Sequence, residues 1–202
     1  MQAGAVLRSS VPRFRRYAVI LCVLLWASSA AALAQEDAEK GIPDRYGLGL
    51  TIGHTVDPVG DIDFLMVTCS ALFDYEKVWR HPAPRDLRFK VEASLGGSFR
   101  PSCDLMASAE MLALFYLEPL STRSFKPYIE GGIGVIFTEH RVKDQGLHLN
   151  FNPQIGFGSE FSFEDGATYF ASLRWHHISN GGLDDENRGV NSIVLVIGRF
   201  FW

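Results

Sequence analysis

From residue 45 onward, hydrophobic and polar side chains alternate with a period of two, and not with the period of 3.6 that marks an α-helix. In residues 87–100 the odd positions are Leu, Phe, Val, Ala, Leu, Gly and Phe, whereas Arg88, Lys90 and Glu92 begin a polar series at the even positions. Residues 127–140 and 147–161 repeat this pattern. Such alternation predicts β-strands that have one apolar face and one polar face.

Five segments with weaker alternation complete the set of predicted strands: residues 45–55, 61–75, 107–116, 168–179 and 191–202. The sequence thus predicts eight strands. Turn-forming residues separate them, for example at 57–60 and 164–166. Short strands at this regular spacing suit a meander that closes on itself. We therefore predict an all-β fold, an eight-stranded antiparallel up-and-down transmembrane β-barrel.

The transmembrane form of this barrel is preferred over a soluble one for two reasons. A soluble ligand carrier would have an apolar interior, and a membrane barrel an apolar exterior, and alternation alone fits both. However, Gly96, Gly132, Gly134 and Gly156 lie among the charged residues of the polar face, a mixture that suits the crowded interior of a narrow barrel. The segments also match the roughly 9 to 11 residues that cross a bilayer as a tilted strand.

The beginning of the chain has the features of an export signal. Four arginines precede the apolar run 17–26, and an Ala-Leu-Ala sequence follows at 32–34. This pattern predicts a cleaved signal peptide at residues 1–34 and a single barrel domain at residues 35–202. The expected location is the bacterial outer membrane. Cleavage removes four of the 19 basic residues and none of the 23 acidic ones, which leaves a net charge of −8 and makes nucleic acid a poor partner.

The remaining cysteines and histidines indicate neither a metal site nor a redox site. Cys69 and Cys103 follow the signal peptide, and both a disulfide and two free thiols stay open for them. Most histidines are scattered over different predicted strands and loops, and no Cys-x-x-Cys motif or phosphate-binding glycine loop occurs. We therefore expect no cofactor.

The densest group of polar residues lies where the strand 168–179 runs into a loop. Period two places His177 and Ser179 on the apolar outer face with Trp175, and it turns Arg174 and His176 into the lumen. A neutral imidazole can accept the proton of a nearby serine, and the glycine-rich backbone that follows can donate N–H groups to an oxyanion. The alternative is that these are interfacial polar residues at a strand end, because His-x-Ser spacing alone is nonspecific.

Residues 177–183, His-Ile-Ser-Asn-Gly-Gly-Leu, resemble the signature of the PagL-type lipid A 3-O-deacylases, also described as acyloxyacyl hydrolase-like proteins. Residues 128–134 and 153–156 extend the resemblance. It implies an outer-membrane enzyme that removes the 3-linked acyl chain of lipid A, a lipopolysaccharide component of the outer leaflet, with Ser179 as nucleophile and His177 as base. Asn180, Gly182 and Asn187 become candidates for the loop that stabilises the oxyanion. The oligomeric state, including a homodimer, stays open.

One departure from the family's pattern concerns the third member of the triad. Fourteen residues after the histidine the family has a glutamate, whereas this chain has Asn191. An amide can accept a hydrogen bond from the imidazole and fix its tautomer, but it cannot stabilise the imidazolium with a full charge. Asp184, Asp185 and Glu186 are the carboxylates of the intervening loop that could replace it. Two functions therefore remain: an ester hydrolase, and a non-catalytic barrel with a structural or interaction role.

Overall fold

The structure, a computed structural model, describes residues 43–58 and 62–201. The expected signal peptide at residues 1–34 lies outside this part of the chain. The described residues form, in order, β1 (Arg45–Asp57), β2 (Asp63–Asp74), α2 (Tyr75–Trp79), β3 (Leu87–Arg100), β4 (Asp104–Tyr116), the 3-10 helix η1 (Glu118–Leu120), β5 (Phe125–Thr138), β6 (Leu149–Phe151), β7 (Gln154–Ser162), β8 (Thr168–Ile178) and β9 (Val190–Phe201).

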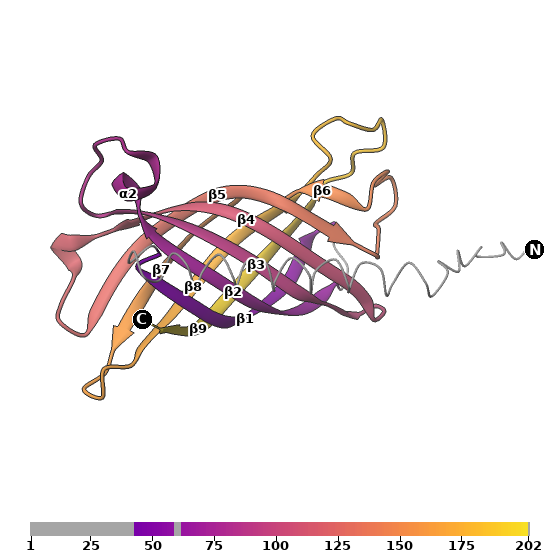
Figure 1. The fold of residues 1–202 in the computed structure, drawn as a ribbon. Coiled ribbons are helices and arrows are strands. Elements are labelled where there is room, and N and C mark those ends of the chain that lie inside the picture. Colours follow the sequence, from indigo (N-terminus) through magenta and orange to yellow (C-terminus); the bar gives the residue numbers. More distant parts are fainter. Residues whose placement is uncertain (1–42, 59–61, 202) are drawn as a thin grey trace, which may run out of the picture. The chain divides into compact units, whose positions relative to one another are not determined.

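The strands form one closed antiparallel barrel (Figure 1). Strands that follow each other in the chain pair, except that β6 and β7 both pair with β5, and β1 pairs with β9, which joins the two ends of the sheet. β6 and β7 keep the same register against β5, with Phe151 opposite Val135 and Gln154 opposite Gly132. They therefore act as one strand, interrupted beside Pro153, which has no backbone N–H to donate. The prediction of an eight-stranded up-and-down barrel is confirmed.

The polar face of the strands points into the barrel and the apolar face points outward. Lys90 and Glu92 are each only 2% exposed, whereas Ile155 and Phe157 on the outer wall are 67% and 64% exposed. A row of exposed apolar side chains around a polar interior is the arrangement of a barrel that is surrounded by lipid. The soluble carrier with an apolar interior is therefore excluded.

Ion pairs fill the middle of the lumen. The guanidinium of Arg174 contacts Glu92 at 2.6 Å and Glu130 at 2.7 Å, and the Lys90 ammonium contacts both of these carboxylates. The glycines on the inner face leave room for these long side chains: a Cβ atom at Gly156 would lie 2.9 Å from Cγ of Arg174. The mixture of charges and glycines on the polar face thus fills the interior of the barrel, as the sequence predicts.

Two local features differ from the expectations, and a third decides between the two states that the sequence left open for the cysteines. The turn between β2 and β3 contains the five-residue helix α2, which the alternation did not indicate. β4 begins at Asp104 and not at Ala107. Cys69 and Cys103 are both free and exposed, so they form no disulfide. Among the described residues, no helix is long and apolar enough to cross a membrane.

Candidate active site

His177 and Asn191 lie opposite each other at one end of the barrel, near the end of β8 and the start of β9. Their side chains meet in a hydrogen bond of 2.7 Å between Nδ1 of His177 and Oδ1 of Asn191. His176 and Ile178, which flank His177, are 3% and 4% exposed and point into the barrel. Because side chains alternate along a strand, His177 lies on the outward face, as period two predicts.

Ser179 follows directly after β8, on the same outward face as His177. Its backbone exchanges two hydrogen bonds with Phe151 at the end of β6, at 2.8 and 3.0 Å, which fixes the position of the serine at the rim. Within the described part of the chain, no hydrogen bond joins the Ser179 hydroxyl to His177. Around His177 and Ser179 lie apolar side chains that are 38 to 46% exposed: Phe151, Trp175 and Ile193.

The loop that connects β8 to β9 is held together by the amides of Asn180 and Asn187. The backbone N–H of Asn180 donates to Oδ1 of Asn187, the N–H of Gly182 donates to Oδ1 of Asn180, and Nδ2 of Asn180 donates to the carbonyl of Glu186. The structure thus gathers all three oxyanion candidates into one loop, but the N–H groups of Asn180 and Gly182 already serve the loop itself. In the described part of the chain, Nδ2 of Asn187 has no hydrogen-bond partner.

Three glycines and a second loop shape the surroundings of His177. Gly181 and Gly182 have φ values of +66° and +84°, which side chains rarely tolerate, so the turn after Ser179 requires glycine. Gly189 packs against the imidazole: a Cβ atom there would lie 2.7 Å from Cε1 of His177. The β5–β6 connection lies beside this loop, because the N–H of Gly146 donates to the carbonyl of Glu186.

The carboxylate nearest to the His177–Asn191 pair comes from β1 and not from the loop. Nδ2 of Asn191 donates to Oδ2 of Asp57 at 3.1 Å, and Arg188 donates to the other oxygen of Asp57 at 2.7 Å. Asp184 instead accepts the backbone N–H of Glu186. Among the described residues, none of the three loop carboxylates bonds to His177. The sequence gives no sign of this contact, because Asp57 stands 134 positions before Asn191.

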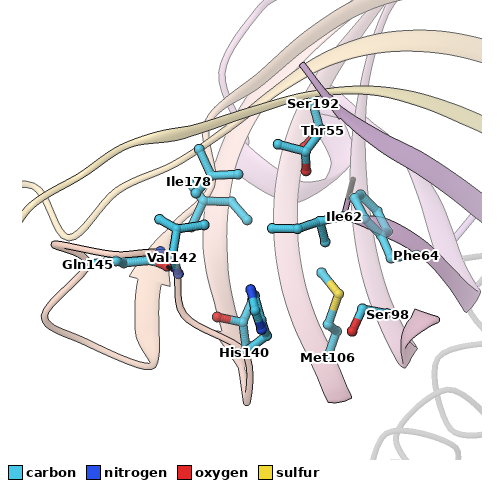
Figure 2. A pocket seen from close by; sticks show the side chains of 12 residues that line it. Thr55, Ile62, Phe64, Ser98, Met106, His140, Val142, Gln145, Ile178 and Ser192 are labelled. Carbon is cyan, nitrogen blue, oxygen red and sulfur yellow. Dashed lines mark hydrogen bonds between the residues drawn. The ribbon is translucent and has the colours of Figure 1, made fainter. Parts of the chain in front are cut away.

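A small cavity lies inside the barrel behind these residues. Figure 2 shows Ile178 and Ser192 among the side chains that line it, with Met106 and His140 on the opposite side. Ile178 and Ser192 alternate with His177 and Asn191, so the cavity is on the other side of the barrel wall from the hydrogen-bonded pair. Within the described residues, no group of three or more potential metal ligands lies close enough together to hold an ion.

A comparison with protein families identifies the barrel's relatives. The family described as "Lipid A 3-O-deacylase (PagL)" matches residues 94–199, slightly more than half of the chain. The chain belongs to the PagL family. The matched region holds His177, Ser179 and Asn191, and Asp57 lies outside it. No curated protein sequence matches this family member.

Solved structures that are similar to this PagL-family barrel include an enzyme and a surface protein. The crystal structure of the outer membrane enzyme PagL is 25% identical, with a TM-score of 0.52, and the match covers 75% of this chain and 97% of that one. Neisserial surface protein A is 16% identical, with a TM-score of 0.57, and the match covers 77% of this chain and 94% of that one. The second match concerns the fold alone.

Proposed function

We propose that this protein is an outer-membrane ester hydrolase that removes the 3-O-linked acyl chain of lipid A, with Ser179 as nucleophile and His177 as base. The observation that carries the proposal is the hydrogen bond between His177 and Asn191, beside Ser179, on the lipid-facing side of a PagL-family barrel. Membership of the family and the likeness to an outer membrane enzyme support the bacterial outer membrane as its location.

The proposed reaction begins with a proton on Nδ1 of His177. If Nδ1–H donates to Oδ1 of Asn191, the lone pair on Nε2 is free to accept the hydroxyl proton of Ser179. Residues two apart on one strand face have Cα atoms roughly 6 to 7 Å apart, within reach of a side-chain hydrogen bond. Such catalytic hydrogen bonds often tighten only when substrate binds.

The Oγ atom of Ser179 then attacks the ester carbonyl carbon, and the carbonyl oxygen becomes an oxyanion. In the described part of the chain, Nδ2 of Asn187 and the N–H of Gly181 donate to no other residue, and we propose these two as donors to the oxyanion. The imidazolium of His177 returns the proton to the sugar oxygen, the C–O bond of the ester breaks, and the acyl group stays on Ser179. A water molecule, deprotonated by His177, releases the fatty acid and restores the serine.

The outer surface around the site supports a lipid substrate. Trp175 and Ile193 lie beside His177 and Asn191 on the barrel wall, and Leu183 on the loop is 73% exposed. An acyl chain that lies in the bilayer can pack against these side chains while its ester group reaches the rim. Substrate would then enter sideways from the outer leaflet and would not pass through the lumen, where Arg174 and its carboxylate partners fill the space.

The test is the lipid A of cells that express the wild-type protein or the Ser179→Ala variant, analysed by mass spectrometry. We expect Ser179→Ala to lower deacylation by roughly 10⁴-fold or more, because removal of a serine nucleophile leaves only binding and oxyanion stabilisation. Ser172→Ala is the matched control, since Ser172 is a buried serine on the inner face of β8, the strand that ends just before Ser179. It should leave deacylation unchanged.

The alternative function, a non-catalytic barrel, makes a different prediction in this experiment. Lipid A would then keep all its acyl chains in the presence of the folded wild-type protein. Full deacylation by Ser179→Ala would instead reject the serine mechanism and retain the enzyme.

A further inference from the structure

Asp57 stands at an irregular position of β1, and this irregularity brings its carboxylate to the site. In β1 the even positions from Leu48 to His54 are exposed and the odd positions from Gly47 to Thr55 are buried. Regular alternation would therefore turn Asp57 into the barrel. The pairing with β9 shifts between Thr55 and Asp57, so that Asp57 and not Val56 lies opposite Asn191. This β-bulge aligns Asp57 with the outward-facing side chain of Asn191, and bulges next to functional sites often re-aim a side chain in this way.

The contacts of Asp57 are specific in direction. A carboxylate only accepts hydrogen bonds, so the amide of Asn191 must turn its Nδ2 toward Asp57, at 3.1 Å. The same rotation turns Oδ1 toward His177, at 2.7 Å. An amide without this neighbour can present either its oxygen or its nitrogen to the imidazole, and each choice selects a different tautomer. The positively charged guanidinium of Arg188 contacts the other carboxylate oxygen of Asp57, Oδ1, at 2.7 Å.

We infer that Asp57 is a positioning residue that orients the amide of Asn191 and thereby holds His177 in the Nδ1–H tautomer, with Nε2 free to accept a proton. The inference rests on the proposed function for its catalytic consequence. The chain His177–Asn191–Asp57 divides the task of a triad acid between two residues: the amide accepts from the imidazole, and the carboxylate behind it specifies which way the amide points. Asp57 also adds a negative charge near the imidazolium that forms during the reaction.

The first variant to test is Asp57→Asn, which keeps the size of the side chain and removes its acceptor-only character. Hydrolysis of purified lipid A by the refolded barrel in detergent is the assay. We expect kcat to fall about 10-fold, the lower end of what a hydrogen bond to a charged group contributes, because Asp57 is half exposed. KM should change less than about twofold, since Asp57 has no part in binding the acyl chain.

A charge-swap variant separates orientation from a merely structural role. Asp57→Asn combined with Asn191→Asp places the carboxylate directly on His177, and the new amide at position 57 can still accept from Arg188 and donate to position 191. This double variant should recover at least wild-type kcat. If Asp57 only anchored Arg188, the double variant would be as impaired as Asp57→Asn. Asp63→Asn is the control, because Asp63 also pairs with an arginine, Arg100, at the same end of the barrel.

A second measurement does not depend on activity. The ¹⁵N chemical shifts of the His177 ring in the refolded protein report which nitrogen carries the proton. Wild type and the charge swap should show Nδ1–H, and Asp57→Asn should show a mixture of tautomers. An unchanged spectrum in Asp57→Asn, or a charge swap no more active than Asp57→Asn, would overturn the inference. If the wild-type protein cleaves no lipid A, the proposed function fails, and the ring spectra still decide the role of Asp57.

Discussion

Gly189 packs directly against the imidazole of His177, so the size of a side chain at this position affects the placement of the ring. A methyl group there would lie 2.7 Å from Cε1 of His177, closer than carbon atoms pack. We predict that Gly189→Ala displaces the ring and lowers deacylation by roughly 100-fold, because displacements of about 1 Å at a reacting group cost this much. Its backbone is outside the left-handed region, so the barrel itself should fold normally.

Gly131→Ala provides the matched comparison for this prediction. Gly131 lies in β5, where an added Cβ atom would come no closer than 3.4 Å to its nearest neighbour, the carbonyl oxygen of Gln154. Lipid A mass spectrometry should find full activity in Gly131→Ala and little in Gly189→Ala. Equal activity of the two variants would show that the ring tolerates displacement and that its position is not critical.

At the scale of the strands, the barrel depends on ion pairs that join β8 to β3 and β5. Arg174 contributes to both pairs, with Glu92 and Glu130, and it is 4% exposed. Removal of one partner from a buried pair leaves an uncompensated charge, so we predict that Arg174→Ala lowers the free energy of unfolding by about 3 to 5 kcal/mol. Urea unfolding of the barrel in lipid vesicles, followed by tryptophan fluorescence, measures this change.

Arg199→Ala is the control for the charge pairs. Arg199 lies on the exposed side of β9, where its guanidinium packs 5.2 Å from the centre of the Phe201 ring and 5.8 Å from that of Tyr169. Its loss should cost about 1 kcal/mol or less. A comparably small loss in Arg174→Ala would mean that Lys90 alone neutralises the two glutamates and that the strands do not depend on the arginine.

The two free cysteines report the orientation of the whole molecule. Cys69 lies on the outer face of β2, and Cys103 lies between β3 and β4 at the same end of the barrel as His177. If the site faces the outer leaflet, a membrane-impermeant maleimide added to intact cells should label Cys103, and lipid should protect Cys69. The Cys69→Ala and Cys103→Ala variants assign the label to one thiol or the other.

Labelling of Cys69 by the impermeant reagent would place the outer wall in water and contradict the membrane orientation. Labelling of Cys103 only after the outer membrane has been permeabilised would mean that the barrel has the opposite orientation, with the site toward the periplasm. In that orientation the pair of His177 and Ser179 would face the inner leaflet, away from lipid A.

The sequence by itself determined the number of strands, the membrane-barrel fold and the outward placement of His177 and Ser179. The strands and the outward placement follow from local alternation, because neighbouring side chains in a strand must point to opposite faces, whichever strands pair with each other. The choice of a membrane barrel over a soluble one followed from the glycines among the charges of the polar face and from the length of the strands. The position of Asn191 relative to His177 also follows from chain order, since β8 and β9 are adjacent and joined by one loop.

Only the tertiary structure decided which charged groups meet. Arg174 pairs with Glu92, 82 positions away, because β8 and β3 face each other across the lumen of the closed barrel. Asp57 reaches Asn191 because β1 closes the barrel against β9 and because one bulge shifts the register beside it. Closure and register are properties of the whole sheet, and a bulge reverses the side to which period two assigns a residue, so no local pattern in the sequence could indicate this contact.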